Sequence, residues 1–477
     1  MIYSRILLVA VTFLFPFFIQ HTVAQDCNCA GELNSLIKKT ETNYAAYYLN
    51  VKDGNRTLYD KLVTTLKEKA LHTDFADCYY VLRSYTDFFK DGHLGVAEIP
   101  VISPAQTDSL SAFVKKSPLA EPEARKYFTS NRKSLDPAEG IWQHESYTIA
   151  ITKDRQKNTF TGVVLNSTNK NWKAGSIKLV MRKTEENLYE TELWRGDLFK
   201  QHTVSSVFKK VLLSAGNMQL AKIFPEEPGL EFINRQNPSL PTFTRLDTDN
   251  LLLCMPNFQV DGNYLDSLLK ANAKEILSTK NLLIDIRGNQ GGNFIYGDLF
   301  EYIMDTDTIR TSPCRIVSSP DNISYHEYLF VKPAARANKP VPDYITALLK
   351  RMEENPGKIV DYYPFPQYPV EKVTPFPVNV AILTDKANLS ASEAFLRYSK
   401  QSKKVKQFGT NTKGVLDYMN TSAIPLECAK YYYLYYPVYF DAGLPKTAIN
   451  NIGIKPDVYS ASQANELIQE VIRYYKK

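Results

Sequence analysis

Residues 378–396 read VNVAILTDKANLSASEAFL, and along this stretch a strand pattern gives way to a helix pattern. The first seven residues form a near-continuous apolar run, which is typical of a strand buried on both faces of a parallel sheet. A short turn follows Asp385, and helical periodicity begins near Ser390. A serine at a helix start is most often a simple N-cap. The free N–H of Ala391 and the helix dipole could also stabilise negative charge beside the Ser390 oxygen.

A second junction of the same kind lies earlier, where residues 281–293 read NLLIDIRGNQGGN. Three glycines directly after a buried strand let the backbone turn sharply and approach another atom closely. Their spacing is not the GxGxxG of dinucleotide sites, and no Walker lysine follows. A plain tight turn therefore remains an alternative. We expect Asp285 and Arg287 to pair with each other rather than to react.

The C-terminal half alternates strand and helix patterns. Another apolar run lies at 251–255 and a helical pattern at 464–474. Strands that alternate with helices predict an α/β core, which we place at 239–477. An insertion rich in Pro and Tyr interrupts it at about 310–375. The aromatic run at 431–440 alternates like a strand and is expected in the core or in the wall of a groove.

The N-terminal half divides into a helical part and a β part. Leucines at three- and four-residue spacings predict a helical cap over 25–100. A polar linker around 100–125 opens the next region, 101–238. Short β-branched and aromatic runs between 137 and 215 predict an antiparallel β-domain there, a barrel or a sandwich. These parts fit the two to four domains that 477 residues suggest, at roughly 100–200 residues per domain.

The first 24 residues have the features of a cleaved signal peptide. Arg5 supplies the positive charge, an apolar stretch runs from Ile6 to Ile19, and small residues precede a cleavage point after Ala24. A transmembrane anchor is the alternative, but the stretch is short for a hydrocarbon core of about 30 Å. No other segment is apolar enough to span a bilayer. We therefore expect export to the periplasm or the outside of the cell.

Composition excludes several classes of protein. The chain is 44% hydrophobic and 23% charged, which is a globular balance. Its net charge of +6 is small and dispersed, so we expect no nucleic-acid partner. Cys27-x-Cys29 has no second pair at similar spacing, and no His-Glu-x-x-His occurs. We expect neither a metal nor another cofactor. Six cysteines survive cleavage and could form disulfides after export.

Four segments occur in an order that resembles a known family. They are DIRGNQGG at 285–292, SASE at 390–393, FGTNTKG at 408–414 and GIKPDV at 453–458. Together they are similar to the tail-specific, or C-terminal processing, family of serine peptidases. The resemblance implies a crotonase-like (ClpP/crotonase-type) α/β peptidase core. It implies that Ser390 is the nucleophile.

The same resemblance implies an oxyanion hole. Backbone N–H groups of Ala391 and of Gly291 or Gly292 would form it. Residues 137–215 lie where processing peptidases carry a PDZ domain, but they have no PDZ-like signature, so recognition of a free C-terminal carboxylate is not assumed.

The general base has two candidates. Many members of the family use a lysine in an "FGKG" segment, but an ungapped alignment from Ser390 places Val415 at that position and Lys413 two residues earlier. The segment Asp91-Gly92-His93 looks like the "DGHT" segment of the tricorn-like, histidine-using branch. Neutral imidazole suits a base, because its unperturbed pKa is about 6.5. We therefore predict His93 as the base and keep Lys413 as the alternative.

The group that would orient His93 stays open. Tricorn-like relatives carry a glutamate near the closing segment, where this chain has Asn450 and Asn451. Other candidates are Asp91, Glu427 and Asp441.

The sequence favours an exported serine endopeptidase that hydrolyses unfolded or extended polypeptides by a Ser-His mechanism. The alternative is a weak or inactive binding protein for peptide, lipid or glycan on the same scaffold.

Overall fold

The computed structural model describes residues 27–476, with short gaps at 53, 101, 186–187, 210, 217, 228–229, 235–236, 363–366, 429–430 and 463. The predicted signal peptide lies outside the described residues. Within the described ranges, no helix combines the length and the apolar character needed to cross a membrane.

A six-stranded sheet forms the centre of the C-terminal half. Its strand order is β10-β11-β12-β17-β18-β21, and all neighbours are parallel except β10 and β11. The strands are β10 Thr242–Arg245, β11 Asn250–Cys254, β12 Asn281–Asp285, β17 Asn379–Thr384, β18 Val405–Gly409 and β21 Val458–Tyr459. Asp285, the last residue of β12, pairs with Leu383 near the end of β17. The loops that follow these two strands therefore leave the same edge of the sheet.

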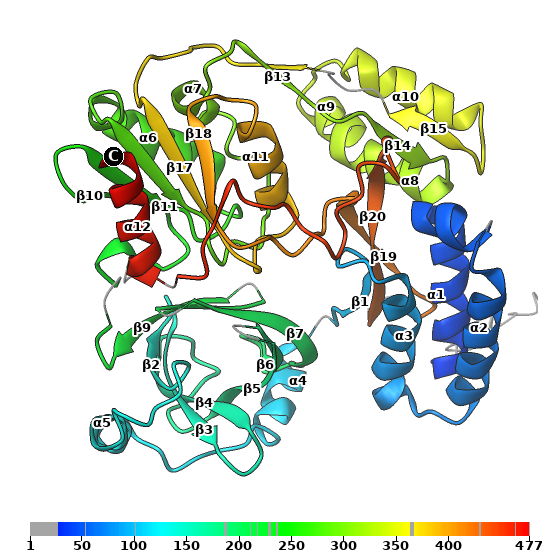
Figure 1. Ribbon diagram of the computed structural model, residues 1–477. Coiled ribbons are helices and arrows are strands. Elements are labelled where there is room, and N and C mark those ends of the chain that lie inside the picture. The colour runs from blue at the N-terminus through cyan, green and yellow to red at the C-terminus, as the bar shows by residue number, and fades with distance from the viewer. Residues whose placement is uncertain are drawn as a thin grey trace, which may run out of the picture.

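Helices cover both faces of this sheet (Figure 1). The helices α6 (Gly262–Ile276), α7 (Phe300–Ile303) and α11 (Ala391–Ser399) pack on one face. The helix α12 (Ala464–Lys476) packs on the other. Strands β11, β12 and β17 are buried on both sides, which explains their near-continuous apolar sequence. The expected α/β core is confirmed.

A second sheet joins the N-terminal helices to the core (Figure 1). Its long central strand β20 pairs with β19 on one side and with β1 and β14 on the other, and β15 pairs with β14. These strands are β1 Gly95–Glu98, β14 Cys314–Val317, β15 Ile359–Tyr362, β19 Tyr418–Pro425 and β20 Tyr432–Asp441. The tyrosine-rich run is thus a buried core strand, as its alternation indicates.

The helical N-terminal region is confirmed. It comprises α1 (Cys29–Asn43), the π-helix η1 (Tyr47–Lys52), α2 (Arg56–Leu71), η2 (Phe75–Asp77), α3 (Cys78–Thr86) and η3 (Asp87–Phe89). Leu33, Leu36 and Leu82 are fully buried and share one core cluster with β20.

The insertion between β12 and β17 carries helices of its own, and they lie above the second sheet in Figure 1. They are α8 (Pro320–His326), η5 (Glu327–Val331), α9 (Lys332–Arg336) and α10 (Asp343–Glu353). A small two-stranded sheet, β13 (Thr308–Arg310) with β16 (Gln367–Pro369), brackets them.

The inserted β region is a closed antiparallel barrel in which β2 pairs with β9. Its strands are β2 Gly140–Gln143, β3 Tyr147–Asp154, β4 Thr159–Ser167, β5 Ile177–Glu185, β6 Leu188–Trp194, β7 Lys200–Lys209, β8 Leu212–Ala215 and β9 Met218–Phe224. A one-turn η4 (Leu230–Phe232) follows.

The linker expected around 100–125 instead contains one helix and the start of a second, α4 (Pro104–Ser111) and α5 (Glu121–Ser130). The helix α4 is capped by Ser103, whose side chain accepts the N–H of Gln106, while the Gln106 side chain accepts the N–H of Ser103. This capping box was readable in the sequence, but the polar composition hid the helix.

Two disulfides join distant segments. Cys27 is bonded to Cys428, and Cys29 to Cys78, at Cα separations of 5.8 and 5.3 Å. Both involve the start of α1, so they fix the first helix to the second sheet and to α3. Cys254 and Cys314 carry no disulfide.

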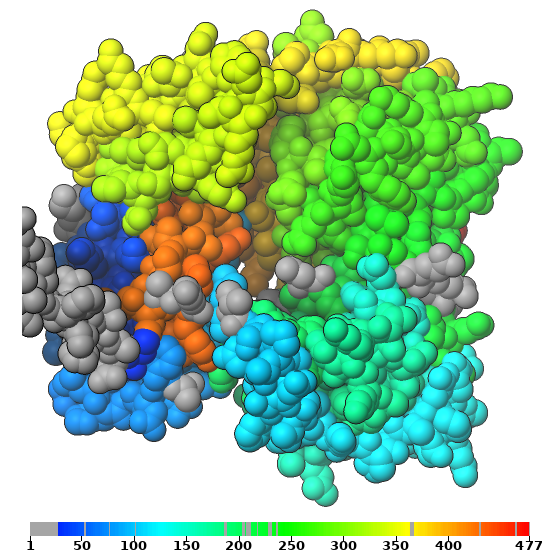
Figure 2. Space-filling model, turned by 180° about the vertical axis from the view of Figure 1, so that it is seen from behind, coloured from blue at the N-terminus to red at the C-terminus, as the bar shows by residue number. Residues whose placement is uncertain are grey.

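The four parts surround a hollow on one face of the molecule. Figure 2 shows it between the green core, the orange strands β19 and β20, the yellow insertion helices and the cyan barrel.

Candidate active site

Ser390 stands at the start of α11 in an unusual backbone conformation, with φ of 58° and ψ of −123°. A non-glycine residue rarely adopts such angles, which cost about 1–3 kcal/mol and persist only where the surroundings enforce them. Two hydrogen bonds hold the turn, because the Ser390 N–H donates to the carbonyl of Val415 at 3.1 Å and to the carboxylate of Glu393 at 3.2 Å. The turn directs the Ser390 hydroxyl to His93.

His93 reaches that hydroxyl from the second sheet. It follows η3 and precedes β1, whose pairing with β20 fixes the segment on the second sheet. Its Nε2 lies 2.8 Å from Ser390 Oγ, although 297 positions separate the two residues. The structure therefore brings together the two side chains that the sequence analysis paired.

The tautomer of His93 follows from its second contact. Nδ1 lies 2.6 Å from the backbone carbonyl oxygen of Tyr418. A carbonyl only accepts hydrogen bonds, so Nδ1 must carry the proton. In the neutral ring Nε2 then has a free lone pair that accepts the Ser390 O–H. This is the arrangement that a general base requires.

The glycine loop after β12 lies directly against the Ser390 turn. A Cβ atom added to Gly291 would lie 2.8 Å from Ala391 N and 3.1 Å from Ser390 Cβ, so only glycine permits this approach. The N–H of Gly291 already donates to the side chain of Asn289 at 2.8 Å. Among the described residues, the N–H of Gly292 has no acceptor. Ala391, as the first residue of its helix, has none within the helix.

Two side chains of the Ser390 segment tie the loops together. Asn388 Nδ2 donates to the carbonyls of Ile286 and Asn289, the latter at 3.1 Å. Ser392 Oγ donates to Asn289 O at 3.1 Å. The second serine of the SASE segment thus positions the glycine loop, a role that its sequence did not suggest.

Asp285 and Arg287 form a buried bidentate ion pair, with N–O distances of 2.9 and 2.7 Å. Both side chains are less than a tenth exposed. Asp385 accepts the N–H of Gly288 at 3.0 Å and joins the same turn to β17. The pairing expected from the sequence is present, and it stabilises the base of the glycine loop.

Glu393 is a buried carboxylate one turn into α11. Oε1 accepts the N–H of Gly414 at 2.7 Å and the Thr412 hydroxyl, and Oε2 accepts the N–H groups of Val415 and Ser390. Burial raises the pKa of Glu393, while these hydrogen bonds lower it. The carboxylate therefore fixes the segment that begins at Thr412 to the helix that carries Ser390.

Lys413 does not take part in this arrangement. Its side chain is exposed, and its backbone N–H donates to Asn388 O at 2.9 Å. Val415 is buried instead, and its methyl groups lie against Gly92, where an added Cβ would come within 2.9 Å. The position aligned with the family lysine thus supports the turn that carries His93.

Among the described residues, the side chains considered for orienting His93 make no hydrogen bond to its ring nitrogens, which contact Tyr418 O and Ser390 Oγ. Asn450 accepts the N–H groups of Leu416 and Asp417, both at 3.0 Å, and Asn451 donates to a carbonyl at 3.0 Å. Asp441 pairs with Arg397 at 2.9 Å.

Asp91 lies closest to the base. It accepts the backbone N–H of His93 at 3.0 Å. Glu427 follows β19, and its Cγ lies 3.8 Å from the Cβ position of Gly31 in α1.

The sequence missed the carbonyl of Tyr418 as the partner of Nδ1. No residue type signals a backbone acceptor, so only the fold could place it. Glu393 was visible in the SASE segment, whose S-x-x-E spacing fits a capping box, but the sequence analysis assigned it no role.

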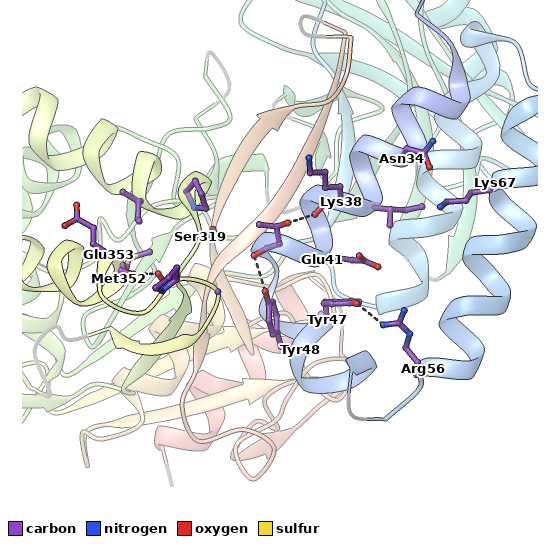
Figure 3. A pocket seen from close by; sticks show the side chains of 17 residues that line it. Asn34, Lys38, Glu41, Tyr47, Tyr48, Arg56, Lys67, Ser319, Met352 and Glu353 are labelled. Atoms are coloured by element: carbon purple, nitrogen blue, oxygen red, sulfur yellow. Dashed lines mark hydrogen bonds between the residues drawn. The ribbon is translucent and has the colours of Figure 1, made fainter.

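A pocket of about 790 Å³ lies elsewhere, between the N-terminal helices and the insertion (Figure 3). Lys38, Arg56, Glu41 and Glu353 contribute charges of both signs. Its lining contains none of the catalytic candidates.

Comparisons with solved structures give remote likenesses along most of the chain. Mature CPAF complexed with lactacystin is 12% identical, with a TM-score of 0.47, over 94% of this chain and 97% of that one. The photosystem II D1 C-terminal processing protease is 14% identical, with a TM-score of 0.36, over 91% and 93%. The tricorn protease is 11% identical, with a TM-score of 0.41, over 94% of this chain and 37% of that one. No curated protein matches the chain significantly.

The comparison with family models gives a direct result. Residues 251–460 match the model described as peptidase family S41. This range contains both strand–loop–helix junctions and the SASE segment, whereas His93 lies before it. Residues 251–460 of the chain thus match peptidase family S41, whose members are serine-type hydrolases.

Proposed function

We propose that this S41 serine peptidase is an exported endopeptidase that cleaves unfolded or extended polypeptides with Ser390 as nucleophile and His93 as general base. The observation that carries the proposal is the 2.8 Å contact between Ser390 Oγ and His93 Nε2, in the tautomer imposed by Tyr418 O. A serine that acted only as an N-cap would direct its hydroxyl to the helix.

The reaction follows from these contacts. His93 Nε2 takes the hydroxyl proton as Ser390 Oγ attacks the scissile carbonyl. The imidazolium then gives this proton to the leaving amine, and an acyl-enzyme remains. Water, deprotonated by the same nitrogen, attacks the ester and releases the acid, which restores Ser390.

The N–H groups of Ala391 and Gly292 are the proposed oxyanion donors. Gly291 is also a member of the predicted set, but its N–H is engaged by Asn289, so its contribution is the close approach of the loop. Donors fixed before the reaction stabilise the developing charge without reorganisation. Parallel strands whose C-terminal ends carry these loops are consistent with a crotonase-like core.

Export is supported by the disulfides. Bonds from Cys27 and Cys29 are stable in oxidising compartments and rare in reducing ones. Both cysteines lie just after the predicted cleavage point at Ala24, so the bonds would form in the mature chain.

The second candidate is a binding protein that has lost hydrolysis. It is favoured by one observation: the ring nitrogens of His93 contact a hydroxyl and a backbone carbonyl rather than a carboxylate. Such a protein would hold an extended peptide, a lipid or a glycan without turnover.

The test is hydrolysis of casein and of unstructured peptides by the purified mature protein, with Ser390→Ala, His93→Ala and Lys413→Ala beside it. The proposal expects turnover that is lost in the first two variants and kept in the third. Peptide binding without any wild-type turnover would favour the binding protein.

A further inference from the structure

No described carboxylate is hydrogen-bonded to the His93 ring, although this ring must become an imidazolium during the proposed reaction. In a Ser-His-Asp arrangement the carboxylate that holds Nδ1–H also stabilises this positive charge. A carbonyl such as Tyr418 O fixes the tautomer but carries no net charge. A negative charge must then come from a group nearby.

Asp91 is a buried carboxylate two residues before His93. Its side chain is closely packed, with only 7% of the residue exposed. Oδ1 accepts the backbone N–H of His93 at 3.0 Å, and Oδ2 accepts the hydroxyl of Tyr44 at 2.6 Å. Both oxygens act as acceptors, which suits the ionised form. Burial raises the pKa of Asp91, and the charge of His93 lowers it.

The other titratable groups around this carboxylate are Tyr44, Tyr418 and Asp417. Burial raises the pKa of both tyrosines, so they are neutral near pH 7. Asp417 accepts the backbone N–H groups of Ile449 and Asn450, which fix it to a different segment.

We propose that Asp91 is the positioning residue of the catalytic base: it fixes the backbone of His93 and supplies the negative charge that stabilises the imidazolium, through space rather than through Nδ1. This inference rests on the proposed function. Asp91 would supply the negative charge that this chain lacks at Asn450 and Asn451, where tricorn-like relatives carry a glutamate.

The N-terminal helices support this carboxylate. Tyr44 caps the C-terminal end of α1 and is fully buried, and its ring lies 5.5 Å from that of Tyr418. Asn50 of η1 donates to the Tyr418 hydroxyl at 3.3 Å. The helical region therefore holds Asp91 through Tyr44 and contacts the carbonyl-bearing Tyr418 through Tyr44 and Asn50, so it is part of the catalytic support.

The variant Asp91→Asn removes the charge and keeps the shape. The amide oxygen can still accept the His93 N–H, and the amide nitrogen can donate to the Tyr44 oxygen. Tyr44→Phe is the matched control, because it removes one hydrogen bond and keeps the charge. Both are measured as the full mature chain on a peptide substrate.

For Asp91→Asn we expect kcat to fall about tenfold at unchanged KM, and the acidic limb of kcat/KM to move about one pH unit lower, because an opposite charge favours the protonated imidazole. Tyr44→Phe should leave the limb in place. An unchanged limb in Asp91→Asn, or an equal shift in both variants, would overturn the inference.

An NMR titration of His93 in Ser390→Ala protein separates this inference from the proposed function, since it needs no turnover. Asp91→Asn should move the titration midpoint to lower pH in that background. If the midpoint moves but the wild-type protein does not hydrolyse peptides, the proposed function is wrong and the role of Asp91 stands. If the midpoint does not move but the wild-type protein is active, the role of Asp91 is wrong and the proposed function stands.

Discussion

The carboxylate of Glu393 accepts the backbone N–H of Val415 at 2.7 Å, within a segment that ends at the carbonyl bound by His93. This segment runs from Thr412 to Tyr418. Its first half is held by the helix that carries Ser390, and its last residue orients the imidazole. The nucleophile and the base are therefore aligned by one stretch of backbone.

Glu393→Gln should consequently impair catalysis in folded protein. The amide presents N–H donors to backbone N–H groups, so at least one buried partner loses its acceptor at a cost of about 1–3 kcal/mol. A displacement of the segment by about 1 Å can cost on the order of 10²-fold in rate. The measurement is kcat on a peptide substrate, together with urea unfolding.

Glu139 in the barrel provides the matched control. It is also fully buried, and it accepts the hydroxyl of Tyr127 and the N–H groups of Asp136 and Lys153. Glu139→Gln should lower the free energy of unfolding similarly and leave kcat unchanged. Equal loss of kcat in both variants would show that the effect of Glu393 is only destabilisation.

Gly291→Ala should inactivate the enzyme. The new Cβ would lie 2.7 Å from Leu389 O and 2.8 Å from Ala391 N, and φ is 85°. The loop must move away from the oxyanion donors, and loss of one such donor costs about 10²–10³-fold in kcat. Gly357→Ala isolates the backbone strain, because φ there is 71° and the Cβ meets open space. Retained activity in Gly291→Ala would exclude the proposed contact between the loops.

Lys413→Ala should retain full activity, since the Lys413 side chain is exposed and the hydroxyl of Ser390 is hydrogen-bonded to His93 instead. Steady-state hydrolysis across pH 5–9 checks this, with His93→Ala as the variant that should lose about 10²–10⁴-fold. A reversal of the two results would make the lysine the base.

Lys178 in the barrel predicts a pH dependence of stability. Burial lowers its pKa to about 7, and its ammonium lies 4.1 Å from the Trp172 ring centroid. The unfolded chain binds this proton more tightly, so the free energy of unfolding should rise between about pH 7 and pH 10. Lys178→Met should flatten this rise, because methionine carries no proton that titrates in this range. The exposed Lys173→Met is the control in urea unfolding at several pH values, and an undiminished rise in Lys178→Met would contradict the assignment.

Local sequence patterns predicted much of this fold because several signals, such as an apolar run and the turn that follows it, indicated the same element. The apolar runs that became β12 and β17, each followed by a turn, placed the glycine loop and Ser390 at one sheet edge. Contacts made by backbone atoms could not be predicted from the sequence. The Tyr418 carbonyl has no residue signature, and α4 depended on a capping box within a polar segment.

Fluorophosphonate labelling of the mature protein, followed by peptide mapping, tests the Ser390–His93 pair most directly. We expect one covalent adduct, on Ser390, with labelling slowed about 10²-fold or more in His93→Ala and unaffected in Lys413→Ala. The absence of an adduct, or its formation at equal rate without His93, would contradict the claim that these two residues form the catalytic pair.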